Sequence, residues 1–294
     1  MAVLAMLNRP SKDAPAHDPA ADAFHFADAG SPQLSVLDLG ATRGDGIFET
    51  ISVGYGRPQA LEHHLRRFAS SARTLALPEP DLDAWRDAIL AVVARIEPAD
   101  EAYVKTVMTR GIEGGDKPTG WVYGSVSPDN SRVRREGIRV VLLDRGYRHD
   151  IEATAPWLLA GAKTLSYAVN RAVAREAARR EADDVVFVSS DGVLLEGPTS
   201  TLVLRRGDEL ITPGTGLGIL DGTTQANVFR FAESKGMSTG FELAAPDVLL
   251  AADAAWLVSS VRLAAPIRAV DGVEKQIDHE FTAELNEYLK HLED

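Results

Sequence analysis

The fold of the first half of the chain is set by the stretch Gly46-Ile47-Phe48-Glu49-Thr50-Ile51-Ser52-Val53. Apolar and polar residues alternate along part of it, which predicts a β-strand with one buried face. The glycines and proline of residues 54–58 then predict a turn. A helix is expected next, because apolar side chains recur at three- and four-residue spacing on one face. That face consists of Leu61, His64, Leu65, Phe68, Ala72 and Leu75.

Around this strand the first half of the chain has the pattern of an α+β domain. A second helix is predicted from a cap at Asp81 or Asp83, and Pro98 lies beyond its end. Further strands are expected near residues 103–109, 121–126 and 138–143. The earliest residues are rich in Pro, Ala, Asp and His without a clear period, which indicates an irregular segment. We therefore expect an N-terminal arm over residues 1–30 and a small domain over residues 31–143.

The second half begins after a predicted link at residues 144–152 and forms a larger domain, residues 153–294. The alanine-rich, charge-laced stretch from Ser166 to Ala182 predicts a helix. Asp191-Gly192, which lies between two apolar runs, predicts the turn of a β-hairpin. Strands are also expected near residues 201–204, 209–211, 255–259 and 267–270, and helices near residues 223–235 and 281–289.

Composition excludes several classes of protein. The chain of 294 residues has 31 Lys and Arg against 43 Asp and Glu, and its formal charge of −12 disfavours nonspecific binding to nucleic acid. Because cysteine is absent, disulfides, zinc ribbons, iron–sulfur clusters and a cysteine nucleophile are excluded. No stretch approaches the ~18 apolar residues of a membrane span, and Met1–Leu7 lacks a basic leader. We therefore expect a cytoplasmic protein with a small-molecule substrate and no metal, nucleic-acid or membrane partner.

Three features of the second half have the residue types for chemistry. Lys163 lies in the apolar context LLAGAKTL, where desolvation favours a nucleophilic amine, although such a lysine can also extend to water. Glu196 follows a predicted strand and precedes a tight turn, where a ligand has room. Gly222, Thr223 and Thr224 begin a predicted helix, where they suit a phosphate or serve as a plain N-cap. An amine, a carboxylate and a phosphate cradle are together what pyridoxal phosphate requires.

Six segments in order resemble the class IV pyridoxal phosphate enzymes. They are RGDGIFET (43–50), HLRRF (64–68), TRG (109–111), KTLSY (163–167), DGVLLEG (191–197) and GILDGTT (218–224). That family includes branched-chain and D-amino-acid aminotransferases and 4-amino-4-deoxychorismate lyase. The resemblance runs from about Leu34 to the C-terminus, and six ordered segments are specific where any one would be weak. It implies pyridoxal 5′-phosphate as the cofactor, a homodimer, and an α+β fold of type IV with two domains, a small α/β sandwich and a larger β-barrel-like domain with helices.

The resemblance also implies a role for each matching residue. Lys163 would be the catalytic residue that forms the Schiff base, and Glu196 would pair with the pyridine nitrogen. Tyr167 would hydrogen-bond the phenolic oxygen of the ring, and it would lie one turn from Lys163 if the helix begins that early. The implied phosphate ligands are Arg67, Gly222, Thr223, Thr224 and Ser260. A surface position is the alternative for Arg67, since Arg66 beside it is equally basic. The candidate substrate contacts are Phe48, Lys105 and Arg110.

These shared residues do not separate the two reaction types of the family. In a transaminase the lysine would move a proton between two carbons, and in the lyase it would take the ring C4 proton before pyruvate leaves. The motifs GDGIFET, EGPTST and GTTQ most resemble the lyase branch. After Gly111 the chain lacks the Arg and His of the D-amino-acid carboxylate trap, and near Gly115-Asp116 it lacks the arginine of the better-known lyases. We therefore expect a lyase that makes 4-aminobenzoate for folate synthesis. A D-amino-acid or branched-chain aminotransferase, dual activity, or a silent cofactor-binding protein are the alternatives.

Overall fold

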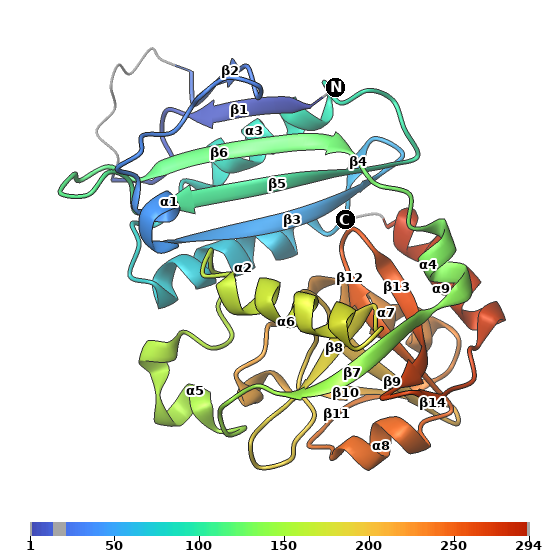
Figure 1. The fold of residues 1–294 in the computed structure, drawn as a ribbon. Helices are drawn as coiled ribbons and strands as arrows, with labels where there is room; N and C mark the ends of the chain where they lie inside the picture. The colour runs from blue at the N-terminus through green and yellow to red at the C-terminus, as the bar shows by residue number, and fades with distance from the viewer. Residues whose placement is uncertain (1, 14–21, 293–294) are drawn as a thin grey trace. The chain divides into compact units, whose positions relative to one another are not determined.

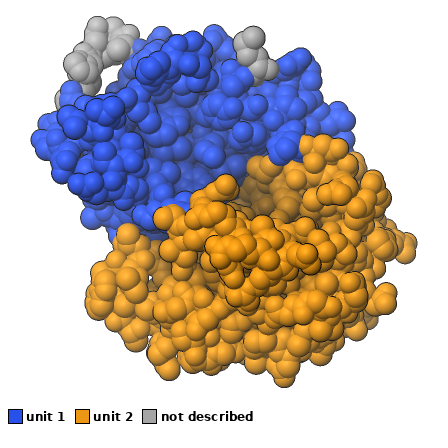
Figure 2. Space-filling view, in the orientation of Figure 1, with its two compact units in different colours: residues 1–128, 162–167, 290–294 blue, residues 129–161, 168–289 orange. Residues whose placement is uncertain are grey.

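A computed structural model describes residues 2–13 and 22–292 (Figure 1). The chain forms two compact units, which Figure 2 shows in different colours. Unit 1 consists of residues 1–128, 162–167 and 290–294, and unit 2 consists of residues 129–161 and 168–289.

Unit 1 is built on a six-stranded antiparallel sheet with the order β2-β1-β6-β5-β3-β4. Its strands are β1 (Val3–Leu7), β2 (Phe24–Ala27), β3 (Gly46–Gly54), β4 (Arg57–Pro58), β5 (Glu101–Thr109) and β6 (Thr119–Val126). Its helices are α1 (Leu39–Arg43), α2 (Leu61–Thr74) and α3 (Leu82–Val93). The strand and the two long helices expected between residues 46 and 96 are therefore confirmed.

Helices α2 and α3 pack on one face of this sheet because both are amphipathic (Figure 1). Asp81 is the N-cap of helix α3, and its carboxylate accepts a hydrogen bond from the Ala84 amide at 3.3 Å. Trp85 of α3 packs edge-on against Phe68 of α2, with ring centroids 4.9 Å apart. On the sheet beneath, a Cβ at Gly120 would lie 2.9 Å from the Trp85 ring, so a glycine in β6 leaves room for the helix.

Unit 2 is built on a mixed eight-stranded sheet with the order β11-β10-β9-β12-β13-β7-β8, and β14 pairs with β13. Its strands are β7 (Ile138–Asp144), β8 (Asp184–Val188), β9 (Thr201–Arg206), β10 (Glu209–Pro213), β11 (Ser238–Glu242), β12 (Ala254–Ser259), β13 (Leu263–Val270) and β14 (Val273–Glu274). Its helical segments are α4 (Ser131–Glu136), α5 (Ile151–Thr154), η1 (Pro156–Leu158), α6 (Ala168–Arg179), η2 (Thr215–Leu217), α7 (Thr223–Ser234), α8 (Pro246–Ala251) and α9 (His279–Lys290).

Strands β7 and β8 of unit 2 are buried on both faces. Val140 and Val186 belong to one apolar cluster, whereas their neighbours Val141 and Val185 belong to another, on the side of Ala177 of α6. Since successive side chains of a strand point to opposite faces, the sheet is covered on both sides here. The α+β class with two sheets and helices is confirmed. Among the described residues, no helix has the length and apolar character needed to cross a membrane.

The predicted division of the chain is wrong at three places. Where it is described, the supposed arm over residues 1–30 contains β1 and β2, which are short strands whose pairing with each other and with distant β6 has no local signal; its residues 14–21 lie outside the described part. The boundary falls after Pro128 rather than after residue 143, because β7 pairs in parallel with β8 and β13. Residues 162–167 belong to unit 1 rather than to the larger domain.

Two predicted elements also differ in extent. The expected hairpin at Asp191-Gly192 has a single bridge, Val188 to Leu194, in place of a second strand. Helix α6 begins at Ala168 rather than Ser166. Lys163 and Tyr167 therefore both precede the helix. Their relative position is set by the segment 162–167 and not by the spacing of a helical turn.

Candidate active site

Lys163 lies in the segment 162–167, which pairs with the start of β3. Thr164 forms an antiparallel bridge with Ile47, and the Lys163 carbonyl accepts a hydrogen bond from the Phe48 amide at 3.1 Å. The Lys163 amide donates to Ser71 Oγ of α2 at 3.1 Å. Because β4 covers only the far end of β3, at Val53 and Gly54, this segment completes an otherwise open sheet edge. The backbone of Lys163 is thus fixed from two sides.

The side chain of Lys163 lies over the ring of Phe48. Its Nζ is 4.6 Å from the ring centroid of Phe48, which is within the range of a cation–π contact. Phe48 in turn meets Tyr167 edge-to-face, with centroids 5.3 Å apart and an interplanar angle of 81°. The structure therefore brings together three of the predicted site residues of unit 1.

Arg67 is a buried residue of α2 whose side chain binds Glu49 of β3. Arg67 Nε donates to Glu49 Oε1 at 2.7 Å, and Arg67 Nη2 donates to Oε2 at 2.6 Å. His64 Nδ1 lies 2.7 Å from the same Oε2. The side chains of Arg67 and Glu49 are 9% and 1% exposed, whereas the neighbouring Arg66 is exposed. Arg67 is thus the inward-facing arginine of the pair, held in a two-point carboxylate contact.

The charges of this cluster are strongly coupled. Burial by itself raises the pKa of Glu49, but the charge and hydrogen bonds of Arg67, together with the hydrogen bond from His64, outweigh burial and hold that pKa far below its ordinary value. Burial lowers the pKa of His64; its hydrogen bond to Glu49 opposes this, and the positive charges of Arg67 and Lys163 lower it further. Burial and the two nearby positive charges therefore favour the neutral form of His64.

Glu49 and His64 were not among the site residues predicted from sequence. A signal for Glu49 exists in the strand itself, since it shares the parity of Ile47, Ile51 and Val53, all of which are buried. A carboxylate at such a position requires a buried cation or donor nearby. His64 was expected on the buried face of α2 and lies there, but its partner could not be inferred from helical spacing alone.

In unit 2, Glu196 lies beside the loop that leads into α7. Its Oε1 accepts a hydrogen bond from the Leu220 amide at 3.2 Å, and its backbone carbonyl accepts one from the Phe187 amide of β8 at 3.0 Å. The carboxylate also acts on Tyr147, whose pKa is raised by burial first and by the charge of Glu196, while Arg145 opposes the shift. The predicted carboxylate and the predicted phosphate cradle are thus neighbours within unit 2.

The start of α7 has the features of an anion site. Gly222 is the N-cap and supplies no side-chain acceptor to the first-turn amides. A Cβ on Gly222 would lie 2.5 Å from Thr201 Oγ1, so only glycine fits there. Thr223 and Thr224 are buried, and the buried Gln225 Nε2 has no hydrogen-bond partner among the described residues. A phosphate would supply acceptors for the first-turn amides and for Gln225 Nε2, so the residues present fit this group.

Ser260 lies in the turn that joins β12 to β13, and it is half-buried. The backbone carbonyl groups of the next two residues, Val261 and Arg262, accept hydrogen bonds from Arg134 of α4 at 3.2 and 2.9 Å. Arg134 is itself buried. The backbone that carries Ser260 is therefore tied to α4 within unit 2.

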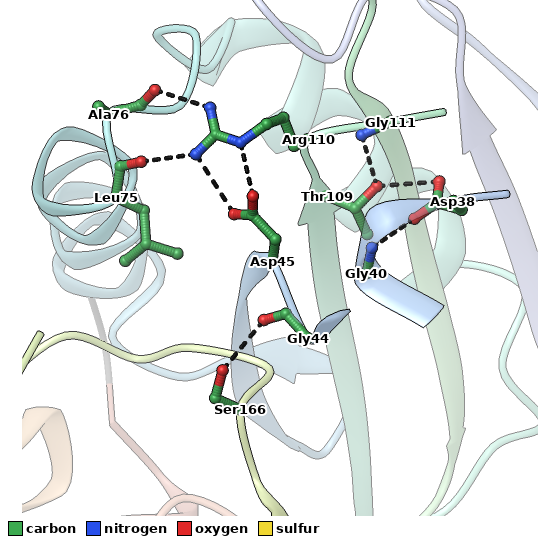
Figure 3. A network of polar contacts seen from close by, with 10 residues as sticks. All are labelled: Asp38, Gly40, Gly44, Asp45, Leu75, Ala76, Thr109, Arg110, Gly111 and Ser166. Atoms are coloured by element: carbon green, nitrogen blue, oxygen red, sulfur yellow. Dashed lines mark hydrogen bonds and ion pairs between the residues drawn. The ribbon is translucent and has the colours of Figure 1, made fainter. Parts of the chain in front are cut away.

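The three candidate substrate contacts lie in unit 1, and two of them share one face of the sheet. Lys105 of β5 is directly opposite Thr50 of β3, and its side chain is exposed. Residues that pair directly share a face, and Phe48 lies two positions from Thr50, so Lys105 and Phe48 are on the same side. Arg110, by contrast, is bound to Asp45 and to backbone carbonyls (Figure 3). No group of side chains in the described ranges, 2–13 and 22–292, has the composition of a metal site.

The chain has the fold of a fold type IV transaminase. The chain belongs to the amino-transferase class IV family, whose model matches residues 46–270. It is 46% identical over 255 residues, 83% of this chain and 88% of the relative, to a bifunctional aminodeoxychorismate lyase / D-amino acid transaminase of Mycobacterium tuberculosis.

Solved structures agree with this assignment. A fold IV transaminase from Curtobacterium pusillum has 53% identity and a TM-score of 0.94, with 98% of this chain and 97% of that chain covered. A hypothetical aminotransferase from Mycobacterium tuberculosis in a PLP-bound form has 42% identity and a TM-score of 0.86, with 90% and 95% covered. That protein has also been solved with alpha-ketoglutarate and PMP bound. The family resemblance expected from the six segments is confirmed.

Proposed function

We propose that this protein is a pyridoxal phosphate-dependent lyase that converts 4-amino-4-deoxychorismate to 4-aminobenzoate and pyruvate. The observation that carries the proposal is the placement of Lys163, whose backbone is fixed on the β3 edge while its amine lies over Phe48. The motifs GDGIFET, EGPTST and GTTQ favour this reaction, which is one of the two in the name of the 46% identical relative. We further propose that the protein acts as a homodimer, as the family resemblance implies, and that it acts in the cytoplasm.

Each residue has a defined part in this proposal. Pyridoxal phosphate, when bound, supplies an electron sink for the charge that develops at the reacting carbon. Lys163 would hold the cofactor through its amine. Once the substrate amine has displaced it, the freed Lys163 amine would take the ring C4 proton, the C–O bond between the ring and the enolpyruvyl group would break, and the released enolpyruvate would take up a proton to become pyruvate. Glu196 would keep the pyridine nitrogen protonated, and Tyr167 would donate to the phenolic oxygen. Within unit 2 the phosphate ligands would be Gly222, Thr223, Thr224 and Ser260, and the family resemblance also implies Arg67.

The anionic substrate requires a cation in a protein with a net charge of −12. Lys105 is our candidate, because its exposed ammonium lies on the same sheet face as Phe48. Phe48 would pack against the substrate ring. This pair supplies one charged and one apolar contact, which suits a ring that carries a carboxylate.

A second candidate activity is transamination, with D-amino acids as substrates suggested by the name of one relative. The Curtobacterium pusillum protein at 53% identity is a fold IV transaminase, and the curated relative carries both activities in its name. The same Lys163 amine would then move a proton between two carbons instead of starting an elimination. Branched-chain amino acids are the remaining alternative substrate.

Paired assays on the purified protein test this proposal. With pyridoxal phosphate present, we expect a visible absorption band from the lysine adduct, and release of both 4-aminobenzoate and pyruvate from aminodeoxychorismate. Lys163→Ala should abolish the band and reduce turnover by about 10²–10⁴-fold, since it removes the proton carrier. Lys235→Ala is the matched control, because this exposed lysine pairs with Glu284 on the surface, and it should leave both unchanged.

The outcomes separate the candidates. Pyruvate release without α-keto acid consumption supports the lyase, whereas turnover of D-alanine with α-ketoglutarate and no 4-aminobenzoate would replace it with the transaminase. A wild-type protein that stays colourless with added cofactor would contradict both.

A further inference from the structure

We propose that Arg110 is a positioning residue for Lys163: it ties together the two parts of unit 1 that hold the lysine backbone. This inference rests on the proposed role of Lys163. It also gives Arg110 a different role from the substrate contact expected from sequence. All of the contacts that carry it lie within unit 1.

The guanidinium of Arg110 joins two elements at once (Figure 3). Nε donates to Asp45 Oδ2 at 2.6 Å, and Nη2 donates to Asp45 Oδ1 at 3.3 Å. On its other side, Nη1 donates to the Ala76 carbonyl at 3.0 Å and Nη2 donates to the Leu75 carbonyl at 2.8 Å. These carbonyls lie just after the C-terminal end of α2, where the helix dipole favours a cation. The fork of Arg110 therefore locks the turn before β3 to the end of α2.

Both elements bound by Arg110 hold the Lys163 segment. The turn before β3 accepts a hydrogen bond from Ser166 Oγ at the Gly44 carbonyl, at 3.3 Å (Figure 3). The next residues of the turn and strand, Gly46 and Phe48, bind Leu165 and Lys163 through the backbone, at 2.8 and 3.1 Å. From the other element, Ser71 of α2 binds the Lys163 amide.

The segment also fits closely against the turn. A Cβ on Gly44 would lie 3.1 Å from Ser166 Oγ, and a Cβ on Gly46 would lie 2.8 Å from Leu165 Cδ1. A small shift of residues 44–46 would therefore reach residues 165–166 directly. Arg110 prevents that shift from a distance, without touching Lys163.

The ion pair of Arg110 and Asp45 is partly exposed to water. Its loss should therefore change the local structure without unfolding the protein. The Arg110 and Asp45 side chains are 37% and 29% exposed. Exposed pairs contribute little to global stability, whereas local opening of a segment is governed by its own contacts. Loss of Arg110 should thus loosen residues 44–48 and 162–167 while the fold persists.

Amide hydrogen exchange on the cofactor-free protein tests this directly. We expect Arg110→Met and Asp45→Asn each to speed exchange in peptides covering residues 44–48 and 162–167 by about tenfold, with no change in peptides of α3. The double variant should add little to either single one, because both remove the same contact. Arg110→Lys, which keeps the charge but not the fork, should be intermediate.

Arg86→Met is the matched control. Arg86 makes an equivalent fork to Glu62, through Nε and Nη2, on the surface of the same unit, but that pair does not touch the turn before β3. It should leave exchange at residues 162–167 at the wild-type value. As a second readout, pyridoxal phosphate should attach to Lys163 about tenfold more slowly in Arg110→Met than in Arg86→Met, as expected for a less preorganised amine.

The outcomes are distinct. Unchanged exchange at residues 162–167 in Arg110→Met would overturn the inference, and so would a raised KM with unchanged exchange, which is the signature of a substrate contact. If wild-type protein fails to bind pyridoxal phosphate, the proposed function fails, while the exchange result still decides the role of Arg110.

Discussion

At the residue scale, the carboxylate of Glu49 is buried in unit 1, where Arg67 is its ion-pair partner and His64 hydrogen-bonds to it. We expect Glu49→Gln to lower the free energy of unfolding by about 3–5 kcal/mol, because it leaves a guanidinium buried without its counter-ion. Glu62→Gln, at the surface partner of Arg86, should cost no more than about 1 kcal/mol. Urea unfolding of both variants measures the difference; equal values would contradict this account of the cluster.

The same cluster predicts how stability depends on pH. Both pKa values are lowered in the fold, from ordinary values of 4.5 for Glu49 and 6.5 for His64, so the unfolded chain binds more protons at each site. Stability should therefore be fully present above about pH 6.5 and should fall progressively on acidification. Urea titrations from pH 8 to 4 measure it, and His64→Gln should flatten the part of the curve just below pH 6.5. A wild-type curve that is level or rising toward acid would show that His64 is not neutral in the fold.

How far the site is predictable from sequence also differs residue by residue. Lys163 and Glu196 stand out because each has an unusual local context, an apolar run and a turn. Which of Arg66 and Arg67 points into unit 1 depends on which side of α2 faces β3, and this is decided by tertiary packing. The role of Arg110 could not be seen at all, since its partners Asp45 and Leu75 are separated from it along the chain and from each other.

At the scale of elements, the close packing around Gly222 at the start of α7 leads to a testable prediction. Gly222→Ala would place a methyl group 2.5 Å from Thr201 Oγ1 and 3.0 Å from Gln225 Cβ. We expect it to displace the first turn of α7 and to weaken pyridoxal phosphate binding by about tenfold or more, since the amides of that turn are the proposed phosphate donors.

Gly216→Ala is the control for this change, because a Cβ there meets nothing within 4 Å. The equilibrium constant for cofactor binding, measured by absorbance titration of both variants, gives the comparison. Equal affinity of Gly222→Ala and wild type would place the phosphate elsewhere.

The elements that sequence predicts well are those with a complete local signal. Helices α2 and α3 each have a periodic apolar face and, for α3, a cap at Asp81. Strands β1 and β2 have only a few residues each; β2 pairs with β1, and β1 pairs with β6, more than a hundred residues further along the chain. Ser166 and Tyr167 were expected to begin a helix, yet they follow a segment that pairs with the open edge of β3, and α6 begins only at Ala168. Tertiary pairing overrides local propensity in these cases.

At the scale of the whole molecule, the chain enters unit 1 three times. Residues 162–167 pair with β3, and the end of the chain returns to the far end of the same strand. There the Lys290 carbonyl lies 2.1 Å from where a Cβ of Gly54 would be, so only glycine allows this approach. The Tyr55 and His291 rings stack next to it, with centroids 4.6 Å apart.

These returns set an order for biosynthesis. A ribosome makes β1 to β6 first, but the edge of β3 stays unpaired until residue 167 has emerged, and the Tyr55 stack cannot form until His291 has. The N-terminal unit is thus the first to begin folding and the last to finish, and an unpaired edge strand is open to pairing with other chains throughout that interval. The strand pairing that fixes the reactive lysine therefore makes the edge of β3 in a nascent chain dependent on a segment more than a hundred residues further along.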